Sequence, residues 1–234
     1  MNNYRQQWED SYKNRDNFLF YPNEEVIRFV SKYLRKRKGL DEFQDINLSV
    51  DVPNFLDLGC GVGRHIIFAY EMGFNPYGID LSQTAIDTAL QWMERRGITD
   101  GVNKVVQGDI TKLPWPDAFF EIVVSHGVLD SMHFEVAKQA VKEVYRVLND
   151  RGFFYCDLIS GDDSAHSREF AGEEIVTMDH EKGTVQSYFN YAKICDMLQD
   201  YFIIRDATLV RQESILYPMS CGARYHLVLQ KTVK

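Results

Sequence analysis

The stretch FLDLGCGVGRHII, residues 55–67, decides the fold because alternating glycines separate an apolar segment from a helical one. The apolar segment, Phe55–Leu58, predicts a buried strand, and Arg64–Met72 predicts a helix. A turn between them reverses sharply, and Gly59, Gly61 and Gly63 tolerate the positive φ that such a turn requires. Glycine also lets a ligand approach the backbone, and the helix start offers unpaired N–H groups. We therefore expect the ligand site at this edge of the sheet.

The segments that follow alternate between strand-like and helix-like patterns. Such alternation requires crossover connections, which favour a parallel sheet covered on both faces. The last third departs from this order and predicts one helix, Gln186–Leu198, followed by an antiparallel pair of strands. The expected strands after the first are Pro76–Ile79, Val102–Gln107, Phe120–Ser125, Phe153–Ile159, Ile203–Val210 and Tyr225–Gln230, and the expected core helices are Ser82–Arg96 and 136–148. Ser82 is expected to cap the first of these helices and Gly97 to end it, and a turn is expected at Asn149–Gly152 after the second.

The first 50 residues form a predicted helical and aromatic extension. Aromatic side chains precede a helix with an apolar face that runs from Val26 to Leu34. We expect Arg35–Lys38 to be the last turn of that helix, where cations interact favourably with the helix dipole. The extension either packs on the core or covers the site as a partial lid, and the sequence leaves both open.

Composition excludes several classes of protein. The chain has 234 residues, 45% of them hydrophobic, which is typical of a globular domain. Its formal charge of −8 argues against a nucleic-acid partner, since such affinity requires clustered Lys and Arg. It has no apolar run long enough to span a membrane and no signal-peptide pattern, so we expect a cytoplasmic protein without a membrane partner. The four cysteines are far apart and predict neither a metal site nor a disulfide framework.

Two ligand classes use a glycine turn of this kind. A dinucleotide favours GxGxxG, but the sixth position here is Arg64, so that pattern fails. Asp57, at the end of the strand, is unfavourable for a pyrophosphate and suits a cationic ligand.

These residues resemble the class I S-adenosylmethionine-dependent methyltransferases, specifically the small-molecule branch. The resemblance covers about residues 54–159 and follows the family's motif order: DLGCGVG, GID ending at Asp80, QGDI ending at Ile110, LPWPDAFFEIVVS, and VYRVLNDRGFF. It implies an α/β fold with a Rossmann-like, doubly wound, seven-stranded sheet that is mostly parallel and ends in a C-terminal antiparallel strand pair. It also implies a single domain over residues 1–234, with a cofactor-binding core at 54–160 and an acceptor-side segment at 161–234.

The resemblance implies S-adenosylmethionine as the cofactor. Asp80 would accept hydrogen bonds from the ribose hydroxyls, although an acid at a helix start also has a structural explanation. Asp109 would bind the adenine amino group while Ile110 packs on the ring; a turn aspartate is the structural alternative. Arg64 either caps the turn or contacts the cofactor carboxylate. The complete set of expected cofactor residues is Trp8, Asp57, Gly59, Cys60, Gly61, Gly63, Arg64, Asp80, Leu81, Asp109, Ile110 and Ser125.

Candidate proton acceptors lie in SHGVLDSMHFE, after the fourth core strand. His126, Asp130 and His133 are the expected catalytic residues, because histidine titrates near neutral pH and a carboxylate can also take a proton. Each can instead be a hydrogen-bonded structural residue. His166 and Arg168 are further candidates, since they lie in the loop after the fifth core strand. We expect no metal.

The chain lacks the Asn/Asp-Pro-Pro-Tyr/Phe motif of amide and base nitrogen methyltransferases, because that position reads Ser-His-Gly-Val. We therefore predict methyl transfer to an oxygen or nitrogen atom of a small molecule, by a monomer or homodimer. The alternatives are a regulatory module that binds S-adenosylmethionine without catalysis and, less favoured, an NAD(P)-dependent oxidoreductase.

Overall fold

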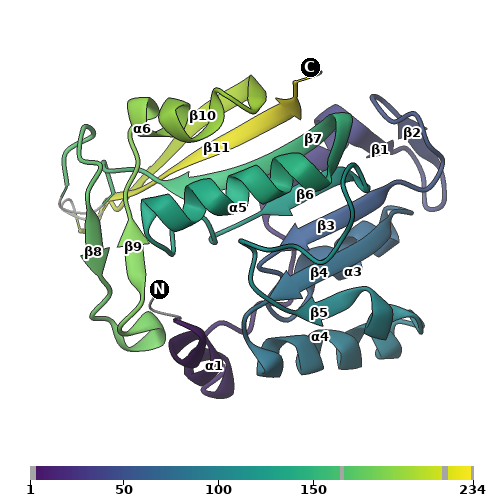
Figure 1. The fold of residues 1–234 in the computed structure, drawn as a ribbon, viewed down its shortest axis with the longest axis horizontal. Helices are drawn as coiled ribbons and strands as arrows, with labels where there is room; N and C mark the ends of the chain where they lie inside the picture. Colours follow the sequence, from purple (N-terminus) through teal and green to yellow (C-terminus); the bar gives the residue numbers. More distant parts are fainter. Residues whose placement is uncertain (1–3, 164–165, 218–220, 233–234) are drawn as a thin grey trace.

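The computed structural model describes residues 4–163, 166–217 and 221–232. Its centre is a seven-stranded sheet in the order β10-β11-β7-β6-β3-β4-β5 (Figure 1). The strands from β3 to β7 pair in parallel, and β11 pairs antiparallel with both β7 and β10. This confirms the predicted Rossmann-like fold class with its antiparallel end. The strands are β3 (Asn54–Leu58), β4 (Asn75–Asp80), β5 (Val105–Gln107), β6 (Phe120–Ser125), β7 (Leu148–Ile159), β10 (Phe202–Glu213) and β11 (Cys221–Lys231).

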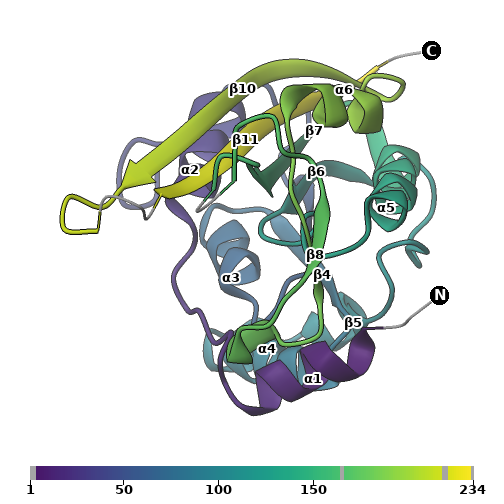
Figure 2. The same cartoon turned by 90° about the vertical axis from the view of Figure 1, so that its left-hand side faces the viewer.

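Helices cover both faces of this sheet (Figure 2). The helices α5 and α6 lie on one face, and α2 and α3 lie on the other. The helical segments are α1 (Arg5–Lys13), α2 (Glu24–Phe29), the π-helix η1 (Val30–Leu34), α3 (Arg64–Glu71), α4 (Gln83–Arg95), α5 (Phe134–Val147), α6 (Tyr191–Leu198) and the 3-10 turns η2 (Gly101–Asn103) and η3 (Asp179–Glu181). Two small antiparallel sheets pair β1 (Arg35–Arg37) with β2 (Phe43–Asp45), and β8 (Glu173–Ile175) with β9 (Val185–Ser187).

Alternation along β3 explains why the sheet is covered twice. Leu56 and Leu58 face α5, whereas Phe55 packs with α2 and α3, and all three side chains are fully buried. Successive side chains of a strand point to opposite faces, so a central strand buried on both sides is apolar throughout. Each fully buried side chain of this size contributes about 1.5–3 kcal/mol relative to an exposed one.

The predicted signals at the ends of α4 are confirmed. The Ser82 hydroxyl accepts a hydrogen bond from Ala85 N at 3.1 Å and caps the helix, and Gly97 adopts φ +78° just beyond its end. The start of α6 is set in the same way, because Asn190 caps it through Lys193 N at 2.9 Å.

One predicted helical segment is wrong, and another begins too early. Arg35–Lys38 is no helical turn: Arg35 is buried, and its guanidinium donates to Asp45 and to the carbonyls of Met72 and Gly73. The partners of Arg35 lie in distant segments, and these contacts favour the extended conformation of strand β1 over a helical turn. The predicted helix Gln186–Leu198 also starts too early, since its first residues belong to β9, where Ser187 N donates to the carbonyl of Asp130.

Other boundaries moved by a few residues. The strand expected at Val102–Gln107 begins at Val105, because η2 occupies the preceding residues. The turn expected at Asn149–Gly152 lies within the continuous strand β7, where Arg151 takes a positive φ of 64°. None of the helices over the described residues is both long and apolar enough to span a membrane. In the same part of the chain, no group of three or more His, Cys, Asp or Glu side chains could hold a metal ion.

Candidate functional site

A cleft of about 660 Å³ opens at the carboxyl ends of β3, β4, β5 and β6, where ligands bind in parallel α/β sheets. Its walls come from the glycine turn, from α1 and from the segment between β6 and α5. The predicted site residues that line it are Trp8, Gly59, Cys60, Gly61, Arg64, Asp80, Leu81, Asp109, Ile110, His126 and His133. The structure places Asp57, Gly63, Ser125 and Asp130 behind this lining.

The glycine turn is shaped so that side chains would not fit. Gly59, Gly61 and Gly63 have φ values of +71°, +52° and +91°. A Cβ on Gly59 would lie 2.5 Å from Val128 Cγ2, and one on Gly61 would lie 2.6 Å from the Tyr12 hydroxyl. The turn therefore requires glycine both for its conformation and for the close approach of neighbouring groups.

Asp80 connects the end of β4 to the glycine turn. Its carboxylate accepts hydrogen bonds from Gly61 N and from Ser82 N, both at 2.9 Å. Burial raises its pKa to about 6, even though these two bonds favour the charged form. The carboxylate thus holds the turn in position and also faces the cleft.

The two residues predicted to bind adenine, Asp109 and Ile110, follow β5 and line the same cleft. One carboxylate oxygen of Asp109, Oδ1, accepts from Thr111 N at 2.8 Å and from the Thr111 hydroxyl at 2.7 Å. This is the turn geometry that the structural explanation expects, yet Asp109 and Ile110 also line the cleft. The two interpretations of Asp109 are therefore compatible.

Two predicted residues supply polar atoms that the fold leaves unsatisfied. Asp57 Oδ2 and Ser125 Oγ are buried and have no hydrogen-bond partner among the described residues. The other oxygen of Asp57 lies 3.4 Å from His65 Nδ1, and His65 Nε2 accepts from Asn23 N at 3.3 Å. Buried polar atoms without partners are rare in folded proteins, and a bound ligand or water is one explanation.

The N-terminal helix α1 forms a wall of the cleft through Trp8 and Tyr12, together with Tyr4 just before it. Glu9 attaches this helix to the start of α4, because its carboxylate accepts from the Ser82 hydroxyl at 2.7 Å and the Thr84 hydroxyl at 2.6 Å. Burial opposes ionisation, but the bonds from Thr84 and Ser82 outweigh it and lower the pKa of Glu9 to about 2. The extension thus both packs on the core and covers the site.

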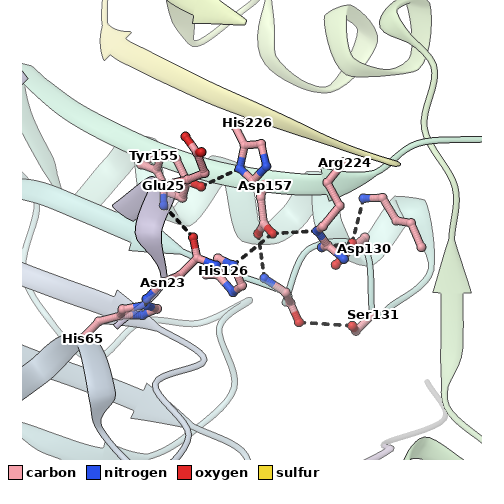
Figure 3. A network of polar contacts seen from close by, with 12 residues as sticks. Asn23, Glu25, His65, His126, Asp130, Ser131, Tyr155, Asp157, Arg224 and His226 are labelled. Atoms are coloured by element: carbon pink, nitrogen blue, oxygen red, sulfur yellow. Dashed lines mark hydrogen bonds and ion pairs between the residues drawn. The ribbon is translucent and has the colours of Figure 1, made fainter. Parts of the chain in front are cut away.

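A polar network lies beneath the other wall (Figure 3). His126 Nδ1 lies 3.0 Å from Arg64 Nη2, and His126 Nε2 lies 3.4 Å from Asp157 Oδ2. A guanidinium can only donate, so Nδ1 accepts and the ring proton is on Nε2, facing Asp157. Burial lowers the pKa of His126 to about 4, which leaves the ring uncharged at neutral pH.

Asp157 and Asp130 share one cation in this network (Figure 3). Arg224 Nε donates to Asp157 at 2.8 Å, and Arg224 Nη2 donates to Asp130 at 2.5 Å. Both carboxylates are buried; burial raises the pKa of Asp130 to about 6, whereas the charge of Arg224 keeps that of Asp157 below its usual value. Gly127 N also donates to Asp157 at 2.7 Å. Asp130 therefore lies behind the cleft wall and contacts it through other residues.

His133 lies at the rim of the cleft. Its Nδ1 is 2.6 Å from Glu173 Oε2, and its Nε2 is 3.1 Å from the Tyr4 hydroxyl. The side chain is 47% exposed, so the contact joins α1 to the start of α5 in a solvated position.

The loop candidates His166 and Arg168 lie outside the cleft lining. The His166 ring stacks on Phe170 with centroids 4.2 Å apart, which is a packing role. Sequence reasoning missed Tyr12, Glu9, Asp157, Arg224 and Glu173, because each acts through a partner far away in the chain and carries no local motif.

The geometry of this site agrees with a known family. Residues 56–156 match the family described as "Methyltransferase domain". Residues 56–156, less than half of the chain, are thus similar to methyltransferase domains.

Curated relatives of the methyltransferase domain differ in what they act on. The uncharacterized methyltransferase YcgJ of Bacillus subtilis is 28% identical over 143 residues, covering 56% of this chain and 53% of that protein. Human EEF1A lysine methyltransferase 2 is 30% identical over 138 residues, covering 56% and 53%. The tRNA (guanine(10)-N2)-dimethyltransferase of Pyrococcus abyssi is 32% identical over 114 residues, covering 45% and 34%. The chain thus spans about half or less of the length of these relatives.

Solved structures share the fold of the methyltransferase domain at low identity. A Burkholderia thailandensis 1,6-didemethyltoxoflavin-N1-methyltransferase, with bound 1,6-didemethyltoxoflavin and S-adenosylhomocysteine, superposes with a TM-score of 0.66 at 14% identity and covers 98% of this chain and 87% of that one. A Methanosarcina mazei S-adenosylmethionine-dependent methyltransferase gives 0.64 at 20% identity, covering 80% and 96%. The [4+2]-cyclase SpnF gives 0.64 at 16% identity, covering 99% and 94%. The fold alone therefore does not specify the reaction.

Proposed function

We propose that this protein transfers a methyl group from S-adenosylmethionine to an oxygen or nitrogen atom of a small-molecule acceptor. The observation that carries the proposal is the open glycine turn, held by Asp80, inside a cleft of about 660 Å³. Small-molecule sites typically have volumes of about 300–1,000 Å³. The cleft is therefore of a size for a cofactor and a compact acceptor.

The residues present suit this cofactor. Asp80, Asp109 and Glu181 line the cleft, and Arg64 is the one lysine or arginine among its described lining residues. An acidic lining favours a ligand with positive charge, as in a sulfonium and an ammonium group. We assign Asp80 to the ribose hydroxyls and Asp109 with Ile110 to the adenine. The remaining expected cofactor residues keep the roles that the family resemblance implies.

The bound cofactor supplies an activated methyl group, so the chain has to orient the acceptor and take up its proton where one is lost. His126 and His133 are the two predicted proton acceptors that line the cleft. We favour His126, because it directly follows β6 and contacts Arg64 at the start of α3, while the buried Asp157 orients its Nε2–H. Asp130 is 1% exposed, and we infer that it positions Arg224.

Two features favour a small acceptor over a protein or tRNA. Helix α1 forms one wall of the cleft, and the lining includes the apolar side chains of Leu19, Val128, Met132 and Val136. The net charge of −8 is unfavourable for tRNA. Because some relatives act on protein or tRNA, a protein acceptor and a tRNA acceptor are both necessary controls. The cytoplasmic location, the oligomeric state and the single-domain organisation stay predictions.

The first test is calorimetric titration with S-adenosylmethionine, S-adenosylhomocysteine and NADH. We expect micromolar binding of the first two only, and a loss of about 10–100-fold in Asp80→Asn, because an amide cannot accept from both backbone N–H groups and the ribose. Asp87→Asn is the matched control, since Asp87 is an exposed residue of α4 outside the cleft lining. Equal affinity of the Asp80→Asn and wild-type proteins would contradict the assignment.

The second test is release of S-adenosylhomocysteine on mixing the protein and S-adenosylmethionine with phenols, amines and nitrogen heterocycles, with a lysine peptide and tRNA as further arms. Turnover only with small molecules supports the proposal. Binding without turnover on any arm supports the regulatory module, and binding of NADH alone supports the oxidoreductase.

A further inference from the structure

The position of Arg64 is electrostatically unfavourable for a positive charge. It is the first residue of α3, where the helix dipole is positive, and no acidic residue lies in the first turn of that helix. Within the described part of the chain, no carboxylate lies within 4.0 Å of its guanidinium. Its hydrogen-bond partner is His126 Nδ1, at 3.0 Å. The charges of Asp57 and Asp157 favour the charged form of this guanidinium, but neither carboxylate contacts it, so no direct ion pair offsets its desolvation.

His126 is oriented as a general base would be, but Arg64 occupies the nitrogen that would accept the proton, Nδ1. Its Nε2–H faces the buried carboxylate of Asp157, which also accepts from Arg224 Nε (Figure 3). Gly127 N donates to the same carboxylate. A base oriented in this way by a third group is the usual arrangement for taking a proton in catalysis. The lone pair that would take the proton is on Nδ1, and it is occupied by Arg64.

Resting on the proposed function, we propose that the cofactor's amino acid carboxylate draws Arg64 away from His126, and that this exchange releases Nδ1 as the proton acceptor. A guanidinium–carboxylate pair is charge-assisted and can be bidentate, so it is stronger than the guanidinium–imidazole bond it replaces. The acceptor's O–H or N–H then gives its proton to Nδ1 while its electron pair bonds the methyl carbon, and the carbon–sulfur pair stays on sulfur. Arg64 thereby makes the base available only when the methyl donor is present.

The release of Nδ1 by Arg64 also indicates which class of molecule accepts the methyl group. A base is needed when the methylated atom carries a proton that must leave, as in a hydroxyl or a heterocyclic N–H. Once Arg64 is bound to the cofactor, the described lining offers no lysine or arginine for an anionic acceptor. The geometry therefore points to an uncharged protic acceptor.

The binding arm of the test uses S-adenosylhomocysteine and 5′-methylthioadenosine, which lacks the amino acid portion. In Arg64→Met we expect the affinity for S-adenosylhomocysteine to fall about 10–100-fold, the loss typical of a hydrogen bond to a charged group, and that for 5′-methylthioadenosine to change less than about twofold. Arg64→Lys, which keeps the charge without the planar fork, should give an intermediate loss. Arg95→Met, an exposed position on α4 outside the cleft lining, should change neither. Equal losses for both ligands in Arg64→Met would overturn the exchange.

The second arm observes His126 itself by ¹⁵N NMR of histidine-labelled protein, with His126→Gln to assign the signal. S-adenosylhomocysteine should shift the Nδ1 resonance and raise the pKa of His126 in the wild-type protein, whereas 5′-methylthioadenosine should not. In Arg64→Met the ring should already be in the released state, and S-adenosylhomocysteine should add no shift. If S-adenosylhomocysteine binds the wild-type protein without changing His126, the exchange is wrong and the proposed function stands. If it does not bind the wild-type protein at all, both fail.

Discussion

Gly61→Ala should destabilise the protein through a defined contact between the glycine turn and helix α1. Gly61 has φ +52°, and a non-glycine residue in the left-handed region costs about 1–2 kcal/mol. The new Cβ would also lie 2.6 Å from the Tyr12 hydroxyl, which is closer than a carbon and an oxygen can pack. Overpacking of this kind costs about 1–3 kcal/mol, so we expect a total loss of about 3 kcal/mol.

Two variants separate these contributions. Gly97→Ala places a Cβ at φ +78° with no atom within 4 Å, so it measures the backbone cost alone, about 1 kcal/mol. Tyr12→Phe removes the hydroxyl, and the next atom of that ring lies 3.5 Å from the new Cβ, an ordinary contact. The double variant Gly61→Ala/Tyr12→Phe should therefore recover at least about 1 kcal/mol relative to Gly61→Ala.

The assay is urea unfolding followed by circular dichroism, with the free energy of unfolding compared at equal m-values. Helix α1 should also become more accessible in Gly61→Ala, which limited proteolysis or hydrogen exchange at residues 5–13 would detect. Equal destabilisation by Gly61→Ala and Gly97→Ala, or no recovery in the double variant, would refute the reasoning, because the close approach of Tyr12 would then carry no energy.

Two further predictions concern charged groups. Glu9→Gln should lower the free energy of unfolding by about 1 kcal/mol at pH 7, the cost of a lost helix-capping contact. Since the pKa of Glu9 is lowered from 4.5 to about 2, its contribution is present above about pH 4.5 and is lost as the pH falls through about 2. The difference between the wild-type and Glu9→Gln unfolding curves should therefore vanish near pH 2, and a constant difference would contradict the assignment. Arg224→Met leaves two buried carboxylates without their cation and should cost about 3 kcal/mol in urea unfolding. Adding Asp130→Asn to Arg224→Met should recover part of this loss; no recovery would show that the uncompensated charge of Asp130 is not what destabilises Arg224→Met.

Helical and strand boundaries show where local patterns were sufficient. Ser82 and Gly97 mark the ends of α4 in the sequence as they do in the structure, because capping depends on residues within one turn. Arg35 contradicted its local pattern, since its partners Asp45, Met72 and Gly73 come from separate segments. The predicted start of the helix at Gln186 was wrong for the same reason, because β9 pairs with β8 there, whereas its predicted end at Leu198 was right.

The sequence alone determined the strand, the glycine turn and the helix that build the cofactor end of the cleft. These features depend on residues that are close together in the sequence: the glycines that allow positive φ, the carboxylates at the strand ends and the order of the motifs. They can therefore be predicted from the sequence. Only the tertiary structure decided what surrounds that turn. Helix α1 reaches it through Glu9, and the His126 network joins β6, β7 and β11 through Asp157 and Arg224. Those contacts depend on how distant segments pack, and residue spacing carries no signal of them.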